Sequence, residues 1–359
     1  MSALSNSPVS ETPSSWARGL GIYSKFVCIY VFLVIFAGAL VTSHDAGLSV
    51  PDWPTSYGEN MFLFPVYRWI GGIYFEHGHR LLATGMGALT VILALWTALV
   101  ENRRWVRFLT YAAFGTVIVQ GLLGGMTVLL RLPDLISTGH GVLAQTFMVI
   151  LVIIAYSHSG SRNHVCENTI SDPTILRAAS ITALLVYIQL ILGAIMRHTG
   201  SGLAILDFPL MAGSLIPLLD DTMVATINAS RKSLQMAPVS LGQIALHLLH
   251  RCGAIVVTLA VISLFIRVVK ERALPFRVRR AATLLFLLVL TQFGLGIASV
   301  LSLRSPVIAS VHVVVGAFVL SVSIVLVLRV REVMKESANL VKHKATKQAR
   351  TLSQVGAPA

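Results

Sequence analysis

Eight long apolar runs constrain this chain more than any other feature of its sequence. A helix that crosses a membrane takes about 20 mostly apolar residues. Runs of that length lie near 26–43, 74–100, 107–130, 136–157, 175–196, 243–267, 281–303 and 307–329. Only 12% of the 359 residues are charged, against about 25% in soluble domains. The sequence therefore predicts an all-α polytopic membrane protein with eight transmembrane helices.

The basic residues indicate how the chain is oriented. Most of the 28 Lys and Arg lie before the first run, in the loops near 101–107, 158–177 and 267–280, or from Arg329 onward. By the positive-inside rule, both termini are predicted to be cytoplasmic. The net charge of +13 does not indicate nucleic acid binding, because these residues alternate with apolar runs and do not form one soluble basic face.

The sequence divides into two bundles, a linker and two tails. The expected parts are a disordered N-terminal tail (1–25), an N-terminal four-helix bundle (26–157), a cytoplasmic linker (158–174), a C-terminal four-helix bundle (175–329) and a basic cytoplasmic tail (330–359). The small residues at 37–39 also resemble a signal-peptide cleavage site. Their recurrence later in the chain favours a retained helix.

The two bundles are predicted to be a tandem duplication. The segment 47–54 (GLSVPDWP) recurs as 202–209 (GLAILDFP) at a shift of 155. These elements are either plain turns or lids over a site. Further pairs match at shifts of 171 and 172: His79-Arg80 with His250-Arg251, Gln120 with Gln292, and His140 with His312. Each unit has an even number of helices, so both units are expected to have the same orientation.

Four matched histidines are the candidate ligands: His79, His140, His250 and His312. All are expected within about two turns of the outer helix ends, roughly 7–10 Å deep, so each bundle offers two facing imidazoles. Such a pair suits the axial positions of a haem. Zinc takes three or four protein ligands, and a di-iron site takes several glutamates. The alternative is that each histidine only forms a hydrogen bond to a neighbouring helix.

Glu76 distinguishes the two bundles. It lies one helical turn from His79, and the matching position in the second unit is His247. A carboxylate there could transfer a proton or stabilise a developing positive charge at the edge of a macrocycle. Arg80 and Arg251 either pair with a haem propionate or are structural. The remaining histidines interpreted as surface or supporting groups are His44, His77, His198 and His247.

These motifs together resemble the haem A synthases, membrane enzymes that convert haem O to haem A for terminal oxidases. The resemblance covers about residues 26–330 and includes Glu76-His-Gly-His79-Arg80 and the outer loop 47–58. Many relatives carry a cysteine pair in that loop, where this chain has Val50 and Ser56. The chain therefore resembles the cysteine-less branch.

The resemblance implies a division of labour between the bundles. The first would take haem O at His79 and His140, with Glu76 as the catalytic carboxylate. The second would hold haem b between His250 and His312. A haem methyl group would be oxidised to a formyl group by successive water-derived hydroxylations, and the electrons would leave through haem b to an acceptor.

Other readings stay open at this stage. One is a di-haem b-type cytochrome that passes electrons, for example from quinol, and another is a haem transporter or chaperone. Haem O synthase, an electron acceptor, membrane lipids and a second copy of the chain are the candidate partners. The Ser/Pro-rich start lacks the arginine-rich character of a transit peptide, which favours a bacterial plasma membrane.

Overall fold

The structure is a computed structural model that describes residues 15–159, 173–214 and 219–355. Within these residues it is all-helical, without a β-strand, and eight helices are long and apolar enough to cross a membrane. They are α1 (Ser15–Ser43), α2 (Gly72–Val100), α3 (Arg104–Leu129), α4 (Asp134–Ser157), α5 (Thr174–His198), α7 (Leu241–Lys270), α8 (Phe276–Leu301) and α9 (Pro306–Val355). The predicted fold class is confirmed.

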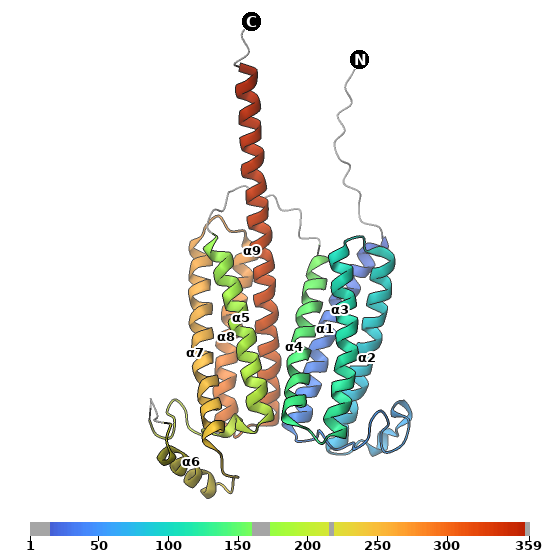
Figure 1. Ribbon diagram of the computed structural model, residues 1–359, viewed down its shortest axis with the longest axis vertical. Helices are drawn as coiled ribbons and strands as arrows, with labels where there is room; N and C mark the ends of the chain where they lie inside the picture. The colour runs from blue at the N-terminus through green and yellow to red at the C-terminus, as the bar shows by residue number, and fades with distance from the viewer. Residues whose placement is uncertain (1–14, 160–172, 215–218, 356–359) are drawn as a thin grey trace.

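The eight helices form two four-helix bundles that stand side by side (Figure 1). In the first, α1 contacts α2 and α4, and α3 contacts α2 and α4. In the second, α5 contacts α7 and α9, and α8 contacts α7 and α9. The second and fourth helices of each bundle, α2 with α4 and α7 with α9, therefore lie diagonally across its interior.

Contacts of α1 and α4 with α5 and α9 join the bundles. The rings of Phe32 and Phe318 stack at 4.1 Å, and the hydroxyls of Thr146 and Tyr187 lie 2.6 Å apart. The Tyr156 hydroxyl donates to the Glu332 carboxylate at 2.6 Å. Polar and aromatic contacts thus fix one bundle against the other along much of their length.

Helix α1 begins earlier, and helix α9 ends later, than the spans predicted from the sequence. α1 starts at Ser15, so residues 15–25 are helical and not a disordered tail. Their apolar face is used, because Leu20 is buried and Trp16 contacts the ring of Trp96. At the other end α9 continues to Val355, through a segment without Gly or Pro that favours helix. The central part of the predicted linker, 160–172, lies outside the described residues.

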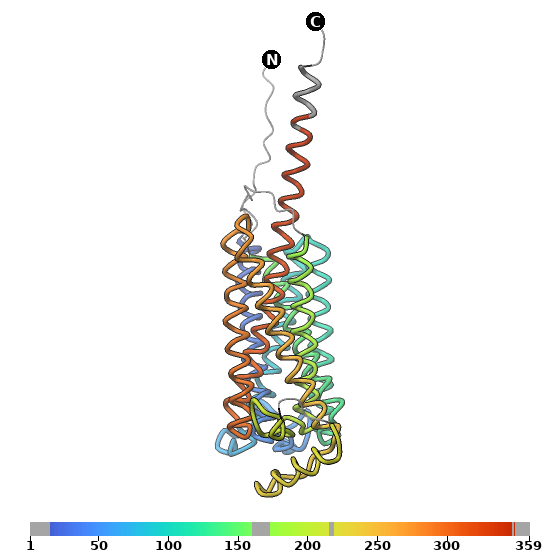
Figure 2. The backbone as a smooth tube through the Cα atoms, turned by 90° about the vertical axis from the view of Figure 1, so that its left-hand side faces the viewer, coloured from blue at the N-terminus to red at the C-terminus, as the bar shows by residue number. Residues whose placement is uncertain are grey.

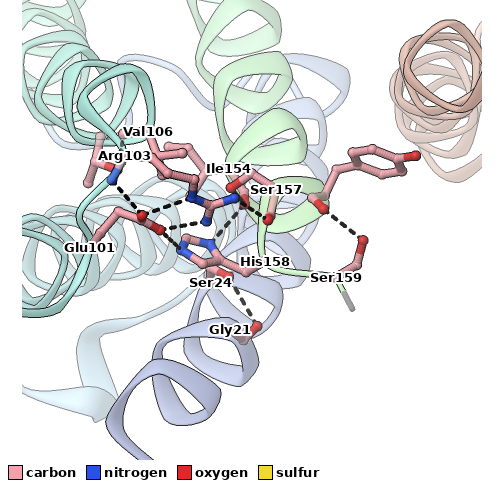
Figure 3. A network of polar contacts seen from close by, with 11 residues as sticks. Gly21, Ser24, Glu101, Arg103, Val106, Ile154, Ser157, His158 and Ser159 are labelled. Atoms are coloured by element: carbon pink, nitrogen blue, oxygen red, sulfur yellow. Dashed lines mark hydrogen bonds and ion pairs between the residues drawn. The ribbon is translucent and has the colours of Figure 1, made fainter. Parts of the chain in front are cut away.

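A polar network closes the first bundle at the end where α1 begins (Figure 3). Glu101 follows α2, and its carboxylate binds the Arg103 guanidinium and lies 3.1 Å from Nε2 of His158. Arg103 also donates to the carbonyl of Ser157 at 2.9 Å. The network ties the connection between α2 and α3 to the end of α4.

The opposite end carries the two long loops. The first contains the short turns η1 (Met61–Leu63) and η2 (Val66–Arg68), and the second contains η4 (Ser201–Leu203) and the helix α6 (Asp221–Ser233). The sequence analysis did not predict α6. It is capped by Asp220, which accepts from the Met223 N–H, and it buries Met223 and Ile227 against the loop core. α1 begins and α9 ends at the far end of the molecule (Figures 1 and 2), and the side that this end faces stays a prediction.

Candidate functional site

The four matched histidines lie at similar depths on diagonal helices. They are six to nine residues from the starts of α2, α4, α7 and α9, which is about 9–14 Å along the axis. His79 and His140 lie on helices that face each other diagonally across the first bundle, and so do His250 and His312 in the second. The structure therefore brings together the two pairs that the sequence predicted.

Each imidazole lies against a glycine of a neighbouring helix. A Cβ atom on Gly38 of α1 would lie 2.9 Å from Cε1 of His79. The matched glycine of α5, Gly193, would place one 3.1 Å from Cε1 of His250. A Cβ atom on Gly124 would lie 3.4 Å from Cε1 of His140, and one on Gly296 would lie 3.2 Å from Cε1 of His312. Glycine at these positions leaves room for the rings.

Three of the four matched histidines have a ring nitrogen that pairs with no described residue. Nδ1 of His79, His140 and His312 is buried and has no hydrogen-bond partner among the described residues. Buried polar atoms are normally paired, and a neutral imidazole nitrogen is a common ligand for iron. Within the described residues, no three His, Cys, Asp or Glu side chains are grouped where they could hold a bare metal ion. The paired imidazoles thus fit a haem.

Glutamines support the histidines, and the second bundle has one more of them. Gln120 donates to the carbonyl of His140 at 3.1 Å, and the matched Gln292 lies 3.4 Å from Nε2 of His312. In the second bundle, Gln189 also donates to the carbonyl of His250 at 2.8 Å, and its Nε2 lies 3.1 Å from Nδ1 of that ring. The residue 155 positions earlier is a valine, which cannot make these contacts.

In the first bundle, Glu76 and Arg80 form a buried ion pair that holds the outer loop. The Glu76 carboxylate accepts from Arg80 at 2.7 Å and from the Val50 N–H at 2.8 Å, and Glu76 is only 4% exposed. Arg80 also donates to the carbonyls of Val50, Asp52 and Thr55. The pair therefore anchors the loop 50–55 over the outer turns of α2.

The second bundle repeats this arrangement without the carboxylate. Arg251 donates to the carbonyls of Ile205, Asp207 and Leu210, each 155 residues after its counterpart. His247 lies between the Ile205 N–H, 3.2 Å from Nδ1, and Nε of Arg251, 3.1 Å from Nε2. A neutral imidazole accepts at only one nitrogen. His247 therefore supplies one hydrogen bond and no charge where Glu76 supplies two bonds and a negative charge.

Comparison with known proteins decides the family. Residues 71–324 match the family of cytochrome oxidase assembly proteins COX15-CtaA. The chain is 30% identical over 298 residues to a heme A synthase of Shouchella clausii, which covers 79% of this chain and 88% of that relative. The chain belongs to the haem A synthase family.

Other heme A synthases resemble the chain over most of its length. The one from Alkalihalophilus pseudofirmus is 26% identical over 312 residues, 85% of this chain and 95% of the relative. The heme A synthase of Shewanella oneidensis is 24% identical over 299 residues, which cover 77% of this chain and 86% of that relative. With its eight apolar helices and bacterial relatives, this haem A synthase family member is a multi-pass bacterial membrane protein.

The outer loop of this family member is shaped by Asp52. Its carboxylate accepts from the N–H groups of Tyr57 and Gly58 at 2.7 and 2.8 Å. Burial raises the pKa of Asp52, but hydrogen bonds from these N–H groups and from Thr55 hold it below its usual value. Asp207 accepts equivalent bonds from Ala212 and Gly213. The interpretation of the repeated Asp as a turn former is thus supported in both loops.

Trp53 lies against α3 beside the first histidine pair. A Cβ atom on Gly125 would lie 2.6 Å from its indole ring, and the preceding residue, Gly124, is the glycine that faces His140. The matched Phe208 instead contacts the ring of Phe293 at 6.4 Å. Trp53 therefore covers α3 next to the candidate site. The sequence analysis did not predict a role for this side chain.

His77 is a buried support of the outer loop. Its ring is 0% exposed, with Nδ1 3.0 Å from the Ser56 hydroxyl and with Phe64 and Trp69 against its faces and edge. Of the two alternatives that the sequence left for His77, a surface group or a supporting group, its burial excludes the first. The matched residue of Ser56 is Met211, so the duplication carried no signal for this pair.

The other three histidines have different surroundings. His247, also considered a surface or supporting group, is 2% exposed and holds the second loop. His44 is exposed and stacks on Phe75 at 4.0 Å. His198 of α5 reaches the first bundle, where its Nε2 would lie 3.9 Å from a Cβ atom on Gly141. No one of these three belongs to the matched histidine pairs.

Proposed function

We propose that this chain is a haem A synthase, an oxidoreductase that converts a methyl group of haem O to a formyl group. The proposal rests on an arrangement of histidines and glycines that both bundles share, and on one residue that differs between them. Both bundles seat two histidines against glycines, and only the first has a carboxylate, Glu76, one turn from its ligand. The family and the heme A synthases that resemble the chain support the same activity.

In this proposal the first bundle binds the substrate haem O between His79 and His140. The unpaired Nδ1 atoms of both rings support this role, because protein contacts do not occupy these nitrogens and imidazole is a common ligand of iron. The glycines opposite the rings, Gly38 and Gly124, keep the rings from being displaced. Trp53 then covers the neighbouring turn of α3.

Glu76 would stabilise the positive charge that develops at the substrate carbon as electrons are withdrawn. Its contacts with Arg80 and the Val50 N–H favour the ionised carboxylate and fix its position. A preorganised charge of this kind lowers the energy of a charged transition state. Each hydroxylation takes oxygen from water and releases electrons and protons, so the reaction also needs an electron acceptor.

The second bundle would bind haem b between His250 and His312, with Gln189 and Gln292 as hydrogen-bond partners of the rings. A bound haem b supplies a one-electron redox centre. His247 leaves this bundle without the carboxylate that we assign to chemistry in the first. We therefore propose electron transfer for the second bundle and oxidation for the first.

The proposal is tested by supplying haem O and identifying the product. The full-length protein is expressed with a haem O source, and the extracted haems are separated and weighed by mass spectrometry. We expect haem A together with its hydroxylated intermediate. Unchanged haem O with a reducible haem b would contradict the synthase and favour a di-haem cytochrome, and reversible haem occupancy without product would favour a transporter.

The matched variants are Glu76→Gln and Glu59→Gln. Glu76→Gln keeps an acceptor for the Val50 N–H and removes the charge, so we expect haem binding to persist and product to fall about 100-fold or more, as for loss of a preorganised charge. Glu59 is an exposed carboxylate of the same loop, paired with Arg68, and its variant should keep full activity. Full product from Glu76→Gln would refute the assigned role.

A further inference from the structure

The first outer loop exposes a group of large apolar side chains. Within the segment 61–70 and the first turn of α2, the exposed ones are Phe62 (66%), Leu63 (79%), Val66 (74%), Tyr67 (79%), Ile70 (73%) and Tyr74 (59%). Single exposed apolar residues are common on soluble surfaces, but contiguous groups mark an interaction surface. This group, named here the apolar rim, has no role in the proposed chemistry.

The backbone behind the apolar rim is held in place. Phe64 is 3% exposed and contacts the buried ring of His77, and Trp69 contacts the same ring edge-on. Arg68 lies over the ring of Phe64 at 4.6 Å and pairs with Glu59. The inward side chains thus fix the loop to α2, while the rim residues between them point outward. The exposure is a property of an ordered loop.

The apolar rim lies at the level of the helix ends. In Figures 1 and 2 the blue loop is beside the outer end of α2, whereas α6 of the second loop extends beyond the helices. The rim continues onto lipid-facing surface, because Tyr74 belongs to α2, and Leu129 and Leu130 at the end of the adjacent α3 are 57% and 53% exposed. A surface in this position meets the boundary between lipid chains and headgroups.

The composition of the rim fits that boundary. Tyr67 and Tyr74 combine an apolar ring with a polar hydroxyl, and Trp69 and Arg68 lie between them along the chain; aromatic residues of this kind gather at membrane interfaces. The exposed face of α6 is different, with Asp221, Thr222 and Ser230. The second loop also exposes Leu210, Leu219 and Leu234, but at 38%, 45% and 51% each is less exposed than every residue of the rim. The two loops occupy equivalent places in the bundles, so the strong apolar exposure is a property of the first loop.

We propose that the apolar rim is an interfacial anchor, which inserts into the lipid leaflet on the side away from the start of α1. The rim contacts the membrane itself. Its apolar side chains lie on an ordered loop beside the lipid-facing helices, where they are buried at the boundary between headgroups and acyl chains. The anchor lies in the same loop that Glu76 and Arg80 hold by its earlier part. It therefore couples the position of that loop to the membrane surface.

The test places a fluorescent label on the rim. In the full-length chain with Cys28, Cys166 and Cys252 replaced by serine, Leu63→Cys or Tyr67→Cys is labelled with an environment-sensitive dye, with Ser230→Cys on α6 as the matched control. Each variant is reconstituted at one copy per lipid nanodisc, and lipids with nitroxides on the upper acyl chain serve as quenchers. We expect the labels at 63 and 67 to lose most of their emission, and the label at 230 to keep its emission.

Aqueous iodide gives the converse readout. Labels at 63 and 67 should be shielded from iodide, while the label at 230 should be quenched. Equal access of iodide to positions 63 and 230 would overturn the proposal. Shielding that appears only with two copies per disc would also overturn it, and would identify the rim as a contact between copies. Neither readout requires haem or activity, so failure here is distinguishable from failure of the proposed synthase function.

Discussion

The two bundles share a histidine frame but differ in the charge beside it. In the first, Arg80 pairs with the Glu76 carboxylate, and in the second, Arg251 meets the His247 ring. Both arginines donate to three loop carbonyls that are related by the same shift in sequence. The comparison teaches that the loop scaffold does not depend on a carboxylate, which leaves Glu76 available for a separate role.

The surroundings of the frame differ as well. The second bundle adds Gln189 to its histidine, and the first adds Trp53 over α3. The first outer loop is apolar at its rim, and the second carries the polar helix α6. These differences fit the proposal that one bundle takes the substrate and the other holds a resident haem. Four experiments test this comparison.

The largest expected effect is the loss of one haem from one bundle. His250→Ala and His312→Ala should abolish the reducible haem b spectrum, because in the proposal each removes a histidine that would hold this haem. His79→Ala should abolish product and leave that spectrum in place. Dithionite-reduced difference spectra of the purified variants measure the result. A haem b spectrum that survives His312→Ala and disappears with His79→Ala would reverse the assignment of the bundles.

Next in size is the loss of the buried ion pair. Glu76→Ala leaves the Arg80 guanidinium, 10% exposed, without its counter-charge, and removing one partner of a buried pair costs about 3–5 kcal/mol. His247→Ala removes a neutral contact and should cost about 1–3 kcal/mol. Urea unfolding in detergent, followed by tryptophan fluorescence, measures both. Equal losses would show that the ion pair gives the first bundle no additional stability.

A smaller effect is expected at the contact of Trp53. Gly125→Ala places a methyl group 2.6 Å from the indole, so the ring must move, and such overpacking costs about 1–3 kcal/mol. The shift and accessibility of tryptophan emission report the movement. Gly121→Ala on the same helix is the control, since a Cβ atom there meets nothing within 4 Å. If both variants behaved alike, Trp53 would not be packed as described.

The smallest effect concerns pH at the opposite end of the first bundle. Burial raises the pKa of Glu101, but Arg103 and His158 lower it to about 2. The folded pKa is below the unfolded value, so this stabilisation is complete above about pH 4.5 and is lost as the pH falls towards 2. We expect a contribution of about 1 kcal/mol, allowing for solvent screening.

Thermal unfolding from pH 6 to pH 2 measures this contribution. Glu101→Gln should lower the melting temperature at pH 6 and converge with the unaltered chain at low pH. Glu271 directly follows α7 as Glu101 directly follows α2, and its carboxylate accepts from the Ala273 N–H at 3.2 Å. Glu271→Gln is the control for removing a carboxylate at a helix end. A constant difference for Glu101→Gln at every pH would refute the role of its charge.

Much of the site was visible in the sequence because the chain repeats its polar residues inside apolar runs. A histidine at membrane depth is rare enough to notice, and its recurrence at a fixed shift separated the four candidate ligands from the others. The partner of Glu76 was harder to predict. Val50 is 26 residues away in a loop, and hydropathy carries no information about which N–H a carboxylate meets.

The sequence by itself determined the eight spans, the matched histidine pairs and the asymmetry at Glu76, because burial in lipid demands long apolar runs and makes each polar exception conspicuous. Only the tertiary structure decided that Glu76 is locked to Arg80, that His77 is buried under the loop, and that α1 and α9 extend beyond the predicted spans. Those outcomes depend on side chains that meet across the fold, and such contacts have no local pattern in the chain.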